Sequence, residues 1–132
     1  MADLVGGQIQ LQFDVIATSL PHIKAGKTRA LAVSSVKRST ILPDMPTIAE
    51  TVPGFNMVGW QGFLVPAGTP SAIIERLHRE IVAVFALPEV RQRMYDLGYE
   101  TVGSSPREFA EFMRADTAQF AKIISGAGIR PE

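Results

Sequence analysis

The chain has 132 residues, of which 46% are hydrophobic, and its 13 Lys+Arg balance 13 Asp+Glu. Zero net charge argues against a strongly basic nucleic-acid-binding protein, and the large apolar fraction argues against intrinsic disorder. With no Cys and only two His, the sequence excludes disulfides and thiolate ligands and makes a His-rich metal site implausible. The length suits one domain of ordinary size.

The first third of the chain predicts a strand–helix–strand unit. The glycine pair at 6–7 is typical of the end of a short helix, and over 8–14 apolar residues alternate with polar ones, as in a half-buried strand. A helix is expected over about 19–25, with Pro21 near its start. The nearly continuous apolar run within 28–34 favours a strand covered on both faces. Together these elements predict a βαβ unit with a right-handed crossover.

The middle of the chain is irregular and rich in proline over 35–58. Residues 47–50 have the spacing of a capping box, which predicts one helical turn. An extended segment over 55–65 follows, and the proline-rich loop 66–70 ends it. This segment contains Trp60, the only Trp, which is either a core residue or the wall of a cleft; for Trp, core is the more common role.

The second half predicts three helices. The first covers 71–86 with Thr69 as its cap, and the second runs from a proline at 88 to a glycine at 98. After a short candidate strand over 99–102, a capping box opens the third helix, which spans about 105–125. The pattern therefore predicts an α/β fold with sheet first and helices after.

Few residues suggest a catalytic or ligand-binding role. Asp14 ends the first predicted strand, where α/β sheets place ligands, so it either shapes a ligand site or only forms a local turn or cap. Backbone N–H groups around 17–19 are better placed than Asp14 to receive a carboxylate. A small enzyme using Asp14 and His22 as an acid–base pair is an alternative, as is a module that binds partners through apolar helix faces. No phosphate-binding loop or nucleophile elbow is present, so no cofactor is expected.

Several motifs follow one another along the chain: Asp3-Leu-Val-Gly-Gly-Gln-Ile, Phe13-Asp14, Leu20-Pro-His-Ile-Lys-Ala-Gly-Lys, Arg29-Ala-Leu-Ala-Val, Leu42-Pro-Asp-Met-Pro-Thr-Ile-Ala-Glu, Trp60-Gln-Gly-Phe-Leu-Val-Pro-Ala-Gly-Thr-Pro and Gly103-Ser-Ser-Pro-Arg-Glu-Phe. Their order and spacing resemble the substrate-binding receptors of tripartite tricarboxylate transporters, the Bug receptors. The resemblance covers essentially all 132 residues.

The resemblance implies a periplasmic receptor of the two-lobe, type II Venus-flytrap fold. Such a receptor binds a small carboxylate and delivers it to the permease subunits of a membrane transporter, without catalysis, cofactor, metal or nucleic acid. Residues 1–53 would be the remainder of the second lobe, and 54–132 the crossing strand and helical tail of the first. Because 1–7 do not resemble a signal peptide, we expect a truncated receptor, prone to self-association through its uncovered faces.

The resemblance also implies which residues border the ligand. They lie at the end of the first predicted strand, in the loop that follows it and on the crossing strand: Phe13, Asp14, Ala17, Thr18, Ser19, Trp60, Gln61 and Phe63.

Overall fold

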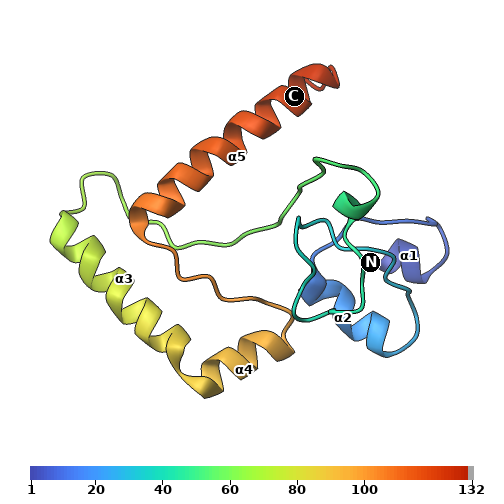
Figure 1. Ribbon diagram of the computed structural model, residues 1–132, viewed down its shortest axis with the longest axis horizontal. Helices are drawn as coiled ribbons and strands as arrows, with labels where there is room; N and C mark the ends of the chain where they lie inside the picture. The colour runs from blue at the N-terminus through green and yellow to red at the C-terminus, as the bar shows by residue number, and fades with distance from the viewer. Residues whose placement is uncertain (131–132) are drawn as a thin grey trace. The chain divides into compact units, whose positions relative to one another are not determined.

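The computed structural model describes residues 1–130, whose regular secondary structure is helical (Figure 1). They form two compact units: Met1–Leu64 with Ala86–Thr101, and Val65–Phe85 with the chain from Val102 onward. The helices are α1 (Ala2–Val5), α2 (Ile16–Lys24), the 3-10 helix η1 (Ile48–Glu50), α3 (Ser71–Ala86), α4 (Pro88–Asp96) and α5 (Pro106–Gly126).

The helices predicted in the second half are confirmed. Both α3 and α4 have the expected bounds, and Gly98 (φ +85°) follows the C-cap residue of α4. The capping box of α5 is formed, because Ser105 Oγ accepts the N–H of Glu108 and a Glu108 carboxylate oxygen accepts the N–H of Ser105. Such caps use donors that the first turn of a helix leaves unpaired, so a few consecutive residues suffice to mark the helix start.

The start of α2 and the cap of α3 differ from the prediction. Helix α2 begins at Ile16 rather than near 19, so Pro21 lies inside it. Leu20, which is 5% exposed, is the buried residue of this helix, and the helix continues through Pro21 without the backbone hydrogen bond that a proline cannot donate. At α3, the Thr69 hydroxyl donates to the carbonyl oxygen of Pro66 (2.8 Å) instead of accepting from the helix.

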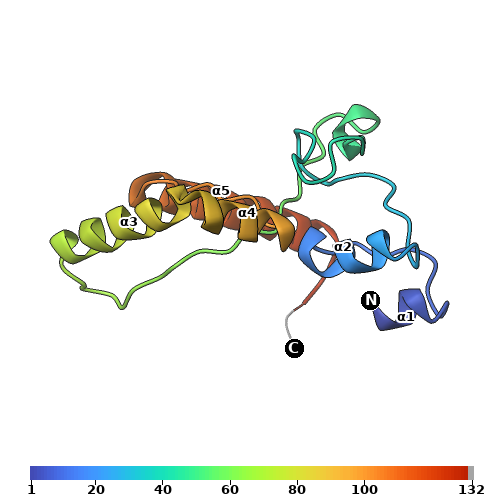
Figure 2. The same cartoon turned by 90° about the horizontal axis from the view of Figure 1, so that it is seen from below.

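The predicted βαβ unit is not confirmed. Within residues 1–130 no segment is assigned as a strand, and neither Figure 1 nor Figure 2 contains a strand arrow. The described residues contain one isolated parallel bridge, in which Val33 donates to Pro46 and accepts from Ile48 (2.9 Å each). A strand exists only when it pairs with neighbours, so the alternating pattern of 8–14 is not enough without a partner segment.

The buried core of the described residues is small. Leu20 and Val33 are the buried hydrophobic residues, and Ser39 and Thr47 are buried polar ones. No residue of α3 or α5 within the described part is buried, although both helices are amphipathic. Large exposed side chains on these two helices include Ile73, Leu77, Val84, Phe112, Ile123 and Ile124. Exposed apolar faces of this kind usually bind another surface.

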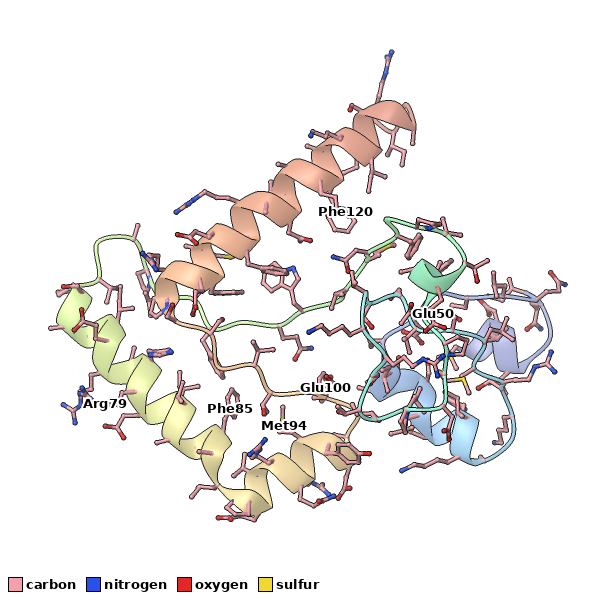
Figure 3. The ribbon with its side chains drawn as sticks, in the orientation of Figure 1. Glu50, Arg79, Phe85, Met94, Glu100 and Phe120 are labelled. Atoms are coloured by element: carbon pink, nitrogen blue, oxygen red, sulfur yellow. The ribbon has the colours of Figure 1, made fainter. Side chains whose placement is uncertain are left out.

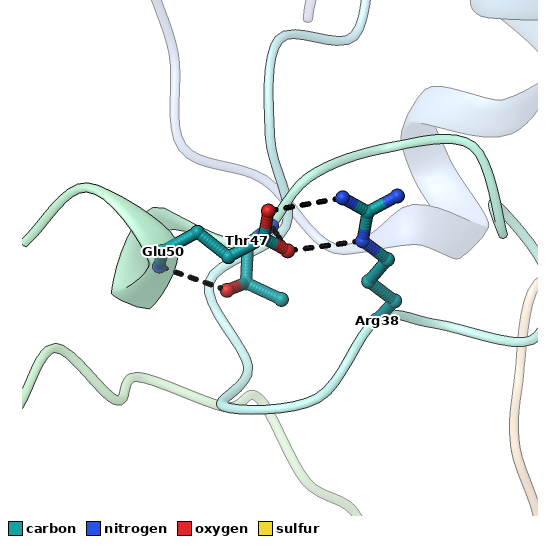
Figure 4. A network of polar contacts seen from close by, with 3 residues as sticks. All are labelled: Arg38, Thr47 and Glu50. Atoms are coloured by element: carbon teal, nitrogen blue, oxygen red, sulfur yellow. Dashed lines mark hydrogen bonds and ion pairs between the residues drawn. The ribbon is translucent and has the colours of Figure 1, made fainter.

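A polar network orders the loop that contains η1 (Figure 4). Arg38 Nε and Nη2 donate to the two carboxylate oxygens of Glu50, at 2.9 Å each. Thr47 Oγ1 accepts the N–H of Glu50, and a Glu50 oxygen accepts the N–H of Thr47, so the predicted capping box is confirmed. The Arg38 hydrogen bonds, followed by the Thr47 N–H, lower the pKa of Glu50. Because both charged side chains are exposed, the network adds little to the stability of the fold and mainly fixes the shape of this loop.

Candidate functional site

The first group of predicted ligand-binding residues, within 13–19, surrounds the start of α2. Asp14 Oδ1 accepts the N–H of Val15 (2.8 Å), and Thr18 Oγ1 donates to the Val15 carbonyl oxygen (3.0 Å). Both contacts are local, so the Asp14 carboxylate serves to organise the entry into the helix. Phe13 is 62% exposed at the beginning of this turn.

The start of α2 also presents backbone donors. The N–H groups of Thr18 and Ser19 donate to the Val15 carbonyl oxygen, at 3.2 Å each. The first N–H groups of a helix lack partners inside the helix; here they belong to Ile16 and Ala17. Such groups carry the positive end of the helix dipole and favour a nearby anion.

The second group lies in the extended segment at 60–63. Trp60 is 41% exposed and Phe63 is 71% exposed, so the interpretation of Trp60 as a buried core residue is not confirmed. This segment runs beside the start of α2, since a Cβ atom on Gly59 would lie 3.2 Å from Val15 Cγ1. Both predicted groups lie in the first unit, and the contact joins Val15 and Gly59, which are neighbours of the predicted residues.

Gly98 contacts the same helix start. It is buried, and a Cβ atom at this position would lie 2.8 Å from both N and Cα of Ala17. The sequence predicted Gly98 only as a helix stop. Its second role was missed because a close approach between distant backbone segments has no local sequence signal.

Sequence reasoning also missed Glu100, which follows α4 and is labelled in Figure 3. Its Oε1 accepts three hydrogen bonds, from Ser39 Oγ (2.7 Å), the Thr40 N–H (2.8 Å) and Thr40 Oγ1 (3.0 Å). Nearby, the Tyr95 hydroxyl donates to the Thr40 carbonyl oxygen (3.0 Å). Partial burial alone would raise the pKa of Glu100, but the hydrogen bonds from Ser39, Thr40 and Ile41 outweigh it and lower that pKa. This carboxylate ties the loop at 39–41 to the end of α4.

We expect this carboxylate to make stability depend on pH. Because the pKa of Glu100 is lowered in the folded chain, its contribution is complete above the ordinary value of 4.5 and is lost as the pH falls through the lowered pKa. Glu100→Gln should be less stable than the wild type near neutral pH. The two proteins should converge at low pH, where the wild-type side chain is also neutral. Urea unfolding from pH 7 to 3 measures this, and parallel stability curves would contradict it.

The alternative acid–base pair is not assembled. Asp14 precedes the first turn of α2, whereas His22 lies in the last turn. At 1.5 Å per residue, the six residues from Ile16 to His22 span about 9 Å, which is too far for direct proton transfer. In the described part of the chain, no group of three or more His, Asp or Glu side chains could hold a metal ion. No helix of the described residues is long and apolar enough to cross a membrane.

Comparison with known protein families identifies the family of this chain. The family described as tripartite tricarboxylate transporter family receptor matches residues 1–129. The chain belongs to this family. It is a family of solute-binding receptors rather than of enzymes, and the resemblance noted in the sequence is confirmed.

One relative is the UPF0065 protein in the tcbD-tcbE intergenic region of Pseudomonas sp. (strain P51). The two sequences are 36% identical over 126 residues, which cover 94% of this chain and 38% of the relative. The chain thus spans less than half the length of this relative, and it matches the C-terminal part.

Two solved structures resemble the chain along nearly its whole length. The R. palustris protein Rpa4515 with adipate has a TM-score of 0.86 and 33% identity, and the match covers 99% of this chain and 44% of that protein. The periplasmic binding protein BugD has a TM-score of 0.83 and 32% identity, with coverage of 100% and 45%. The architecture is therefore that of part of a periplasmic binding protein.

Proposed function

We propose that this chain is part of an extracytoplasmic solute-binding receptor, located in the periplasm, that captures a small carboxylate. The receptor would deliver this ligand to the membrane permease subunits of a tripartite tricarboxylate-type transporter. The observation that carries the proposal is the close structural match to a family member with adipate, a dicarboxylate.

The proposed site uses the start of α2 and the adjacent extended segment. A ligand carboxylate would accept hydrogen bonds from backbone N–H groups of the first turn of α2, where the helix dipole stabilises negative charge. The exposed faces of Phe13, Trp60 and Phe63 would contact the methylene groups of a ligand such as adipate. Asp14 would repel a carboxylate directly, so its role is to hold the Val15 N–H and thereby the turn.

We also propose the finer architecture. The chain would divide at 53/54, with 1–53 in the second lobe and 54–132 forming the crossing strand and helical part of the first. The alternating segment 8–14 and the apolar segment 28–34 would become strands where further strands pair with them, as in a βαβ unit. What supports pairing of the segment 28–34 is the isolated parallel bridge between Val33 and Thr47.

Titration of the 132-residue chain with adipate, followed by NMR, tests the function. We expect saturable shifts of the amides within 13–19 and 60–63, with a dissociation constant of about 1 mM, since only part of a two-lobe cleft contributes. Hexane-1,6-diol, which has the same six-carbon chain but no carboxylate and no charge, serves as the control and should cause no shifts. Absence of saturable adipate binding, or equal shifts with the diol, would contradict the proposal.

A helical interaction module is the second candidate function, favoured by the exposed apolar faces of α3 and α5. These faces would also support self-association of the chain, because a protein without net charge lacks long-range repulsion between copies. Light scattering coupled to size-exclusion chromatography should then show a mass that increases with concentration. A constant monomer mass at all concentrations would contradict self-association.

A further inference from the structure

We propose that Gly98 is a positioning residue for the carboxylate site, because its backbone sets the place of the first turn of α2. The inference rests on the proposed function and adds a residue outside the predicted site. It concerns the first unit alone, to which α2 and the end of α4 both belong.

The end of α4 fixes the conformation of Gly98. Its N–H donates to the Tyr95 carbonyl oxygen (2.9 Å), and the N–H of Tyr99 donates back to the Met94 carbonyl oxygen (2.9 Å). This arrangement ends a helix with one left-handed residue, which glycine adopts without strain. The φ of +85° agrees, so α4 determines where the Gly98 backbone lies.

The backbone of α2 leaves no room for a side chain at this position. A Cβ atom on Gly98 would lie 2.8 Å from N and Cα of Ala17 and 3.2 Å from the carbonyl carbon of Ile16. All three are main-chain atoms, so a rotamer change cannot relieve the clash. Either the first turn of α2 or the end of α4 must move.

The end of α4 is anchored on both sides of Gly98. Before it, the Tyr95 hydroxyl donates to the Thr40 carbonyl oxygen (3.0 Å). After it, Glu100 Oε1 accepts from Ser39 Oγ (2.7 Å) and from two groups of Thr40. The hydrogen bonds at the start of α2 are local ones around its N-cap residue Val15, whereas those at the end of α4 reach the loop at 39–41. A side chain at 98 therefore displaces that turn, together with the N–H groups of Ile16 and Ala17.

The chain contains a matched control. Gly26 follows the C-cap residue of α2 as Gly98 follows that of α4, and it also has a positive φ (+67°). A Cβ atom on Gly26 would meet nothing within 4 Å. Gly26→Ala and Gly98→Ala thus impose the same kind of backbone strain, and only Gly98→Ala adds the clash with Ala17.

The test compares these two variants in the full 132-residue chain. Gly98→Ala should shift the amide resonances of 16–19 and speed their hydrogen exchange, and it should raise the adipate dissociation constant about tenfold, since binding groups must stay within about 0.5 Å of their positions. Gly26→Ala should lower the melting temperature yet leave these amides and the adipate affinity unchanged. Equal amide shifts in the two variants would overturn the inference.

A milder variant covers the case in which Gly98→Ala does not fold. Tyr95→Phe removes the hydroxyl that anchors the end of α4 and should shift the same amides of 16–19, whereas Tyr99→Phe should not. Unchanged amides in Tyr95→Phe would overturn the inference in that case. If the wild-type chain binds no adipate while the amides respond as expected, the proposed function fails, and what stands is that Gly98 sets the place of the first turn of α2.

Discussion

Leu20→Ala should lower the free energy of unfolding by about 2–3 kcal/mol, near the lower end of the range for Leu→Ala substitutions that leave a cavity in a core. Leu20 is 5% exposed and is the buried residue of α2, within a core that contains few hydrophobic side chains. The cost stays near the lower limit because exposed neighbours can move into the space. Urea unfolding followed by circular dichroism measures the change.

Leu31→Ala is the control for this experiment. The substitution is chemically the same, but Leu31 is 55% exposed and should change the free energy of unfolding by less than about 0.5 kcal/mol. Equal losses in the two variants would mean that the core is not built around α2.

Ser39→Ala should cost about 1–3 kcal/mol, because it leaves polar groups without their partners in a buried setting. Ser39 is 7% exposed, and its Oγ both donates to Glu100 Oε1 (2.7 Å) and accepts the Ile41 N–H (3.1 Å). The substitution removes one of the three donors that hold the Glu100 carboxylate. The same unfolding measurement applies, and the loss should be smaller at low pH, where Glu100 is protonated.

Ser35→Ala provides the comparison for Ser39. The Ser35 hydroxyl makes a single exposed hydrogen bond to the Lys37 carbonyl oxygen (2.7 Å), within its own loop. Water can replace that partner, so the variant should be nearly as stable as the wild type. A loss as large as that of Ser39→Ala would show that the loop as a whole, and not the contact with Glu100, sets the stability.

Much of the helical structure was predictable because its signals are local. The capping boxes at Thr47 and Ser105 use side chains and N–H groups three residues apart, and both are formed. The start of α2 was predicted too late, because Pro21 was interpreted as a first-turn proline although it lies inside the helix. The strand over 8–14 was predicted from a real alternation, but pairing requires a partner that the described residues do not provide.

The candidate site was predictable only in part. The family resemblance selected the residues at 13–19 and 60–63. That they contact a ligand stays a prediction. The contact between Gly59 and Val15, which brings these segments together, has no sequence signal. The same holds for Gly98, whose helix-ending role is visible in the sequence while its approach to Ala17 is not.

The sequence by itself determined the family and the ends of α3, α4 and α5. These features depend on motif order or on contacts between residues at most four positions apart. The tertiary structure decided the hydrogen bond between Ser39 and Glu100, sixty-one positions apart, and the close approach of Gly98 to Ala17. Such contacts arise only after the chain has closed long loops, and the preferences of neighbouring residues carry no information about which distant partner they will meet.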